Sequence, residues 1–172
     1  LWVAGPSGVG KSRLLEEFRL RAQLEGALVL SGVATEQGVP FGPMLEPLRA
    51  ALSHLDAGRL EPFRAPLGAI LPEWHREGDL TLDPQKEKTR LQNAVVDVFG
   101  VLLASRPIVL LLDDWQWSDT SSRELLKALS RLTADLPFLV LGADRTPGDD
   151  TSATFLAPFE AVEVGEIAGA LL

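Results

Sequence analysis

A glycine-rich stretch of eight residues, GPSGVGKS (Gly5–Ser12), constrains the fold more than any other part of the sequence. The apolar residues LWVA precede it, and apolar side chains recur at helical spacing from Lys11 to Leu24. This order predicts a buried strand, a tight turn and an amphipathic helix. Glycine suits such a turn because it adopts left-handed backbone conformations without steric cost.

The spacing of the glycines, Lys11 and Ser12 fits the pattern G-x-x-x-x-G-K-[S/T], the P-loop. In such a loop the backbone N–H groups converge on a phosphate chain, and the positive end of the following helix faces the same anion. We expect Lys11 to contact the β- and γ-phosphates of a nucleotide, and Ser12 to offer its hydroxyl to Mg²⁺. The expected nucleotide-binding residues are Gly5, Pro6, Ser7, Gly8, Val9, Gly10, Lys11, Ser12 and Arg13.

Two adjacent carboxylates follow the most apolar strand pattern in the chain, IVLLL (residues 108–112). Open α/β sheets bind ligands at the carboxyl ends of their strands, and a P-loop site needs an acidic metal ligand there. We therefore predict that Asp113 binds the metal ion. Three roles stay open for Asp114: it could orient the attacking water, help to order the waters of Mg²⁺, or accept hydrogen bonds from the following loop.

The expected strands are continuous apolar runs that alternate with helical patterns, which is typical of a parallel sheet covered by helices on both faces. A mainly helical insertion is expected around residues 40–84, where Pro66 and Pro72 interrupt the apolar pattern, and a longer helix over residues 83–105. The fold class is thus α/β, a three-layer P-loop NTPase. The expected strands cover residues 1–4, 27–34, 108–113, 138–143 and 161–164.

Composition narrows the class of protein. The length of 172 residues suits one domain, and the absence of cysteine excludes disulfides and thiolate zinc sites. The net charge of −8 disfavours nucleic-acid binding by this segment, so DNA binding would need a separate domain. No apolar run approaches the ~20 residues that cross a bilayer, and no signal peptide is visible. We expect a cytoplasmic location without membrane contact.

Other side chains near the double aspartate have simpler expected roles. Trp115 and Trp117 could stack on a partner, but we expect them to pack in the core. We expect Asp119 to cap the helix that begins near Thr120. Gln116 could touch the attacking water, but we favour a surface amide. Arg145 follows a buried strand, and this position favours a polar sensor over a solvated loop charge.

Four segments in this order resemble the AAA-type ATPase module of the STAND class, signal-transduction ATPases with numerous domains: GPSGVGKSRLLEEF, GVPFGPMLEPLR, RPIVLLLDDWQWSDTSSRELLKALSRL and FLVLGADR. Similar NB-ARC-like modules occur in bacterial LuxR-type and related multidomain transcriptional regulators. The resemblance implies a strand order of 5-1-4-3-2 and binding of ATP or ADP with Mg²⁺. It assigns Asp113 to the metal, Asp114 to water activation and Arg145 to sensing the γ-phosphate. Many P-loop ATPases carry Glu at the position of Asp114, so slow hydrolysis is expected.

We therefore expect residues 1–172 to form one P-loop NTPase domain, truncated at both ends, in a longer protein that also has lid and effector domains. Its expected role is an ATP/ADP conformational switch with slow ATP hydrolysis and self-association in the full-length protein. Two alternatives stay open. A small-molecule kinase would need an arginine-rich lid, and a nucleotide-binding oligomerisation scaffold would need no hydrolysis.

Overall fold

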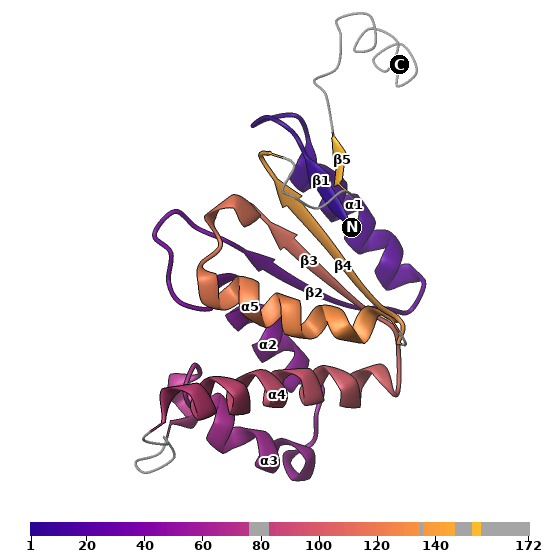
Figure 1. The fold of residues 1–172 in the computed structure, drawn as a ribbon. Helices are drawn as coiled ribbons and strands as arrows, with labels where there is room; N and C mark the ends of the chain where they lie inside the picture. The colour runs from indigo at the N-terminus through magenta and orange to yellow at the C-terminus, as the bar shows by residue number, and fades with distance from the viewer. Residues whose placement is uncertain (76–82, 135, 147–152, 156–172) are drawn as a thin grey trace, which may run out of the picture.

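The computed structural model describes residues 1–75, 83–134, 136–146 and 153–155. A parallel sheet lies between helices that cover its two faces (Figure 1). The strands are β1 (Trp2–Ala4), β2 (Leu28–Val33), β3 (Ile108–Asp113), β4 (Phe138–Asp144) and β5 (Ala153–Phe155). The α-helices are α1 (Lys11–Leu24), α2 (Gly42–Leu52), α3 (Ala57–Leu67), α4 (Pro84–Leu103) and α5 (Thr120–Leu129). Short 3-10 helices are η1 (Pro72–Trp74), η2 (Trp115–Trp117) and η3 (Ser130–Ala134).

The strand order places the candidate residues at one edge of the sheet. The order is β2-β3-β4-β1-β5, with every pair parallel, and read from β5 it is 5-1-4-3-2. Because β4 lies between β1 and β3, the carboxyl ends of these three strands are neighbours. The strand expected at residues 161–164 lies outside the described residues, and Ala153–Phe155 pairs with β1 as the fifth strand.

The apolar run of β3 is explained by burial on both faces of the sheet. Ile108, Leu110 and Leu112 pack into the larger core, which is built mainly on α2, α4 and α5. Val109 and Leu111 pack into a smaller core under α1. None of the five side chains is more than 6% exposed, so the strand is a rigid support for the acidic residue at its end.

The insertion between β2 and α4 is mainly helical in its described residues, as expected. Its apolar run is interrupted where expected, because α3 ends at Leu67, one residue after Pro66, and Pro72 begins the separate helix η1. Pro62 and Pro66 lie inside α3, and Pro47 lies inside α2. Pro47 has no N–H to donate to the carbonyl of Pro43, four residues earlier. That carbonyl lies against Gly32 of β2, where a Cβ atom would overlap it, so glycine permits the close approach of α2 to the sheet.

Helix α4 follows the expected pattern closely. Asp83 caps it by accepting hydrogen bonds from the amides of Gln85 and Lys86, and Pro84 occupies its first turn. Its apolar stripe faces the larger core, and its other face carries charged side chains. Among the helices in the described ranges, none combines the length and the apolar character that a membrane crossing requires.

Candidate nucleotide-binding site

The glycine-rich loop has the backbone geometry of an anion cradle. Gly8 and Gly10 have φ angles of 84° and 101°, in the left-handed region that side chains other than glycine rarely adopt. Gly10 also caps α1, which begins at Lys11. Within the part of the chain that the structure describes, the amides of Gly8, Gly10 and Lys11 donate no hydrogen bond. Such N–H groups at a helix N-terminus suit a phosphate chain.

Lys11 lies inside the loop rather than in solvent. Its side chain is 8% exposed, and its Nζ donates to the carbonyls of Gly5 and Pro6 at 2.8 Å and 3.0 Å. An ammonium group has three donors, so one is left for an anion once these two bonds are made. The loop thus holds a buried cation beside the unpaired backbone amides, and the charge fits a phosphate group.

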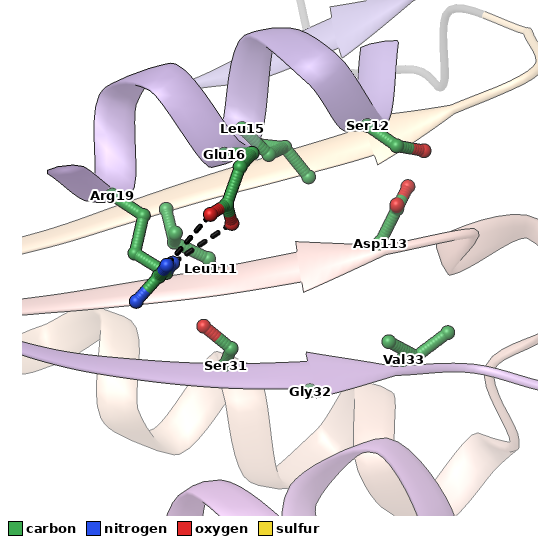
Figure 2. Close-up of a pocket in the computed structure, with 9 residues that line it drawn as sticks. All are labelled: Ser12, Leu15, Glu16, Arg19, Ser31, Gly32, Val33, Leu111 and Asp113. Carbon is green, nitrogen blue, oxygen red and sulfur yellow. Dashed lines mark hydrogen bonds and ion pairs between the residues drawn. The ribbon is translucent and has the colours of Figure 1, made fainter.

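Ser12 and Asp113 line the same pocket, which has a volume of about 160 Å³ and lies between α1 and the strands β2 and β3 (Figure 2). The Asp113 carboxylate points from the end of β3 towards the start of α1, where Ser12 lies. An ion pair between Glu16 and Arg19 borders the pocket further along α1. Asp113 keeps one oxygen for its own loop, because its Oδ1 accepts the amide N–H of Asp114 at 2.8 Å.

The oxygen ligands that Ser12 and Asp113 offer suit Mg²⁺ better than a metal ion that is coordinated by protein side chains alone. No cluster of three or more His, Asp or Glu side chains that could hold a metal occurs among the described residues. Mg²⁺ usually keeps several waters and takes one or two protein oxygens together with phosphate oxygens. A hydroxyl and a carboxylate beside an anion cradle match that requirement.

Asp114 does not continue the strand. Its φ angle is 52°, in the left-handed region, so the chain turns sharply there and enters η2. Its Oδ1 accepts a hydrogen bond of 2.9 Å from the side-chain Nε2 of Gln116. Gln116 is half-buried, which corrects the expectation of a surface amide. The third role considered for Asp114, accepting a hydrogen bond from the loop, is therefore observed, and it is compatible with the other two.

Arg145 lies at the carboxyl end of β4, next to the glycine-rich loop. The two segments are joined by the hydrogen bond from the amide of Gly5 to the carbonyl of Asp144, at 3.2 Å. The Arg145 guanidinium lies over the ring of Trp117, 5.4 Å from its centroid. Asp144 turns its carboxylate to the backbone amides of Arg145 and Thr146 instead of to the guanidinium.

The two tryptophans have different surroundings. Trp115 is 4% exposed and lies against Trp2 with ring centroids 5.8 Å apart, so its expected packing role is confirmed. The Arg123 guanidinium lies over the Trp115 ring, 5.9 Å from its centroid, and donates to the Trp115 carbonyl at 3.2 Å. Trp117 is only partly buried, and its contact is with Arg145. Trp117 therefore stacks beside the candidate site, which is the less favoured of the two roles considered for it from the sequence.

Asp119 caps α5, as expected, and also reaches a second element. Its Oδ1 accepts the amide N–H of Ser122 at 3.0 Å and its Oδ2 accepts the Ser122 hydroxyl at 2.5 Å. The same Oδ1 accepts the amide N–H of Phe41 at 3.2 Å, at the start of α2. Phe41 has a left-handed φ of 60°. One carboxylate thus ties together the segments that follow β2 and β3.

We predict that Asp119→Ala lowers the free energy of unfolding by about 2 kcal/mol at neutral pH, because it removes a helix cap and leaves the Phe41 amide unpaired. Burial raises the pKa of Asp119, but the hydrogen bonds from Ser122 and Phe41 outweigh it, so the pKa is lowered. A carboxylate with a lowered pKa in the folded state stabilises the fold above its unfolded pKa, and this contribution is lost as pH falls through the folded pKa. Urea unfolding from pH 7 to pH 3 should therefore show that the loss of unfolding free energy in Asp119→Ala becomes smaller below about pH 4.

The control variant is Asp119→Asn, which keeps a capping oxygen and should lose less unfolding free energy at neutral pH. An equal loss in both variants would contradict the capping role of Asp119.

Comparison with known proteins agrees with this geometry. A family model described as the AAA ATPase domain matches residues 1–141. An uncharacterised protein of Rhizobium meliloti (strain 1021), R02095, is 25% identical over 166 residues, covering 83% of this chain. The alignment spans 16% of that relative, so the chain corresponds to a small part of its length. Because the family model covers most of the residues, including the glycine-rich loop and the double aspartate, the chain belongs to the AAA ATPase domain family.

Proposed function

We propose that this domain binds ATP or ADP together with Mg²⁺, hydrolyses ATP slowly and acts as a conformational switch in a multidomain regulator. The observation that carries the proposal is the convergence of three elements at one edge of the sheet. They are the glycine-rich loop after β1, Arg145 after β4 and the acidic pair after β3. Membership of the AAA ATPase domain family supports nucleotide binding and ATPase activity.

The proposed division of roles follows the chemistry of each group. The loop amides and Lys11 bind the β- and γ-phosphates. These hydrogen-bond donors are already in place, so helix α1 need not move when the phosphates bind. Ser12 and Asp113, which line the same pocket, would hold Mg²⁺. When bound, the ion neutralises negative charge on the phosphate oxygens. The buried strand beneath Asp113 fixes this carboxylate in place.

Asp114 is the proposed base that orients and polarises the attacking water. It follows the metal carboxylate directly, and its side chain has a defined position because Gln116 donates to it. Aspartate is shorter than glutamate by one methylene group, which is consistent with slow turnover. Residues 1–172 are proposed to be one NTPase domain of a longer protein, in which other domains respond to the bound nucleotide.

Arg145 is the proposed sensor, and its contact with Trp117 suggests how the switch works. A guanidinium over an indole ring is held by roughly 0.5–2 kcal/mol, weak enough for a phosphate to replace it. ATP offers a γ-phosphate and ADP does not, so only ATP draws Arg145 off Trp117. A ligand shifts a conformational equilibrium only by its differential contacts with the two states, and this contact supplies the difference.

Arg145→Ala should weaken binding of a non-hydrolysable ATP analogue about tenfold while leaving ADP binding unchanged, because one charge-assisted contact to the γ-phosphate is lost. Isothermal titration calorimetry on the full-length protein measures both affinities. Arg131→Ala, an exposed arginine after α5, is the matched control and should change neither. An equal loss for ATP and ADP would mean that Arg145 senses no γ-phosphate.

The proposed role in a multidomain regulator also concerns parts of the protein outside this domain. DNA binding would belong to a separate domain, because this chain carries a net charge of −8 and would repel a phosphate backbone. A LuxR-type context and self-association are proposed on the resemblance alone, and a cytoplasmic location is proposed with them. A small-molecule kinase is the alternative enzyme class. Measuring whether loss of ATP requires an added phosphate acceptor separates it from an ATPase, and hydrolysis by the protein alone would exclude the need for an acceptor.

A further inference from the structure

Gln116 carries a buried polar atom that the domain's own packing leaves unpaired. Its Nε2 donates to Asp114, while its Oε1 is buried and has no hydrogen-bond partner among the described residues. The opposite orientation of the amide would place its oxygen against the carboxylate, so the donor orientation is the favourable one. Leaving a buried acceptor unpaired destabilises a protein, and such a group in a native fold calls for an explanation.

The neighbouring backbone is also fixed in an uncommon conformation. Asp114 adopts a left-handed φ of 52°, and η2 follows at once. Arg123 holds this turn from outside by donating to the carbonyl of Trp115. Non-glycine residues in the left-handed region are uncommon and concentrate at sites where the surrounding structure enforces them. The turn and the amide therefore act on the same carboxylate.

Together these observations define which oxygen of Asp114 is available. Gln116 occupies Oδ1, and within the described part of the chain no protein group donates to Oδ2. An aspartate that rotates freely presents either oxygen in many positions, whereas one held by an amide presents one oxygen in a restricted position. Restricting a reacting group in this way lowers the barrier of the step that it assists.

We infer that Gln116 is a positioning residue that fixes the Asp114 carboxylate for ATP hydrolysis and leaves Oδ2 to the attacking water. The inference rests on the proposed role of Asp114 as the base and assigns a residue to support it. Gln116 acts through Asp114 and contributes nothing to the binding of the nucleotide itself. Its effect should therefore fall on kcat and on transition-state affinity, not on KM or on ADP affinity.

The test replaces Gln116 by methionine, which has nearly the same length and no hydrogen-bonding group. On the full-length protein, Gln116→Met should lower kcat for ATP hydrolysis about tenfold and leave KM unchanged. Calorimetry supplies a readout independent of turnover. The affinity for ADP with aluminium fluoride, an analogue of the transferring phosphoryl group, should fall about tenfold, and the affinity for ADP with beryllium fluoride should stay the same.

A double variant separates positioning from a general structural effect. If Gln116 acts only through Asp114, the pair Asp114→Asn with Gln116→Met should be no slower than Asp114→Asn alone. Additive losses would overturn the inference, because Gln116 would then act on something else. Ser118→Ala is the matched control: its hydroxyl is also buried and unpaired in the same turn, but it does not contact Asp114, and its removal should leave both readouts unchanged.

The remaining outcomes are also decisive. Wild-type values for Gln116→Met, with a slow Asp114→Asn variant, would overturn the inference and leave the proposed function standing. Wild-type hydrolysis by Asp114→Asn would overturn the inference together with the assignment of Asp114 as the base, and nucleotide binding would stand. If Gln116→Met melts at a clearly lower temperature, Gln116→Glu is the second variant, because it keeps the size of the side chain and repels the carboxylate. It should show the same selective loss of kcat.

Discussion

Replacing Lys11 by alanine should abolish measurable ATP binding, with the affinity lowered at least about 100-fold, or roughly 3 kcal/mol. The ammonium is the only positively charged side chain buried among the described residues, and it lies against the backbone carbonyls at the start of the loop. Its removal takes away the cation that meets the phosphates and also leaves the carbonyls of Gly5 and Pro6 without their donor. Both effects lower the affinity for ATP.

Isothermal titration calorimetry with ATP and Mg²⁺ on the full-length protein measures this loss. Lys11→Met keeps the alkyl chain that fills the loop and removes only the charge, so it should bind as weakly as the alanine variant. Lys127→Ala, an exposed lysine on α5, is the control and should bind as the wild type does. Unchanged affinity in either Lys11 variant would remove the basis of the proposed function, because no other described side chain supplies a buried cation to the loop.

Local patterns predicted the glycine-rich loop and the strands β1 to β4, but not the fifth strand, Ala153–Phe155. The helix predicted from Lys11 to Leu24 and the strand over residues 108–113 have the bounds that the structure gives them. Both depend on neighbours in the sequence: apolar spacing, glycine in the turn and a capping position. The helical character of the insertion also followed from local spacing. Helix α3 accommodates Pro62 and Pro66 because Leu67 is fully buried and Phe63 packs on the same core, and this burial outweighs helix propensity.

The sequence did not predict contacts between residues that are far apart in the chain, and the reason is physical. The bond from the Phe41 amide to Asp119 joins residues 78 positions apart, and nothing in either segment specifies the other. The stacking of Arg145 on Trp117 likewise depends on β4 lying beside β3 in the sheet. The sequence predicted that Gln116 would be a surface amide. Its burial results from the left-handed turn at Asp114, and the periodicity of apolar residues does not reveal such a turn. The sequence therefore predicted the candidate site residues, but not the hydrogen bonds and stacking contacts between them.

Asp114→Asn should reduce the rate of ATP hydrolysis by about 100-fold or more while leaving ATP affinity close to that of the wild type. A positioned base typically accelerates proton transfer by 10²–10⁴-fold, and an amide cannot accept the proton of the attacking water. Asparagine also tolerates the left-handed conformation at this position, so the turn should survive the substitution. Phosphate release under single-turnover conditions measures the rate, and calorimetry with a non-hydrolysable analogue measures the affinity.

The reverse experiment, Asp114→Glu, tests whether the length of the side chain alone limits turnover. Glutamate is the residue of many P-loop ATPases, so a longer reach by itself would make the variant faster. We expect no gain, because glutamate is less readily accommodated at a φ of 52° and its carboxylate would be displaced from the Gln116 amide. A faster Asp114→Glu variant would show that reach, and not the held geometry of the turn, sets the rate. Equal rates for the wild type and Asp114→Asn would instead show that Asp114 is not the base and that the second carboxylate serves only to hold the loop; an absence of phosphate release from both would favour a nucleotide-binding scaffold.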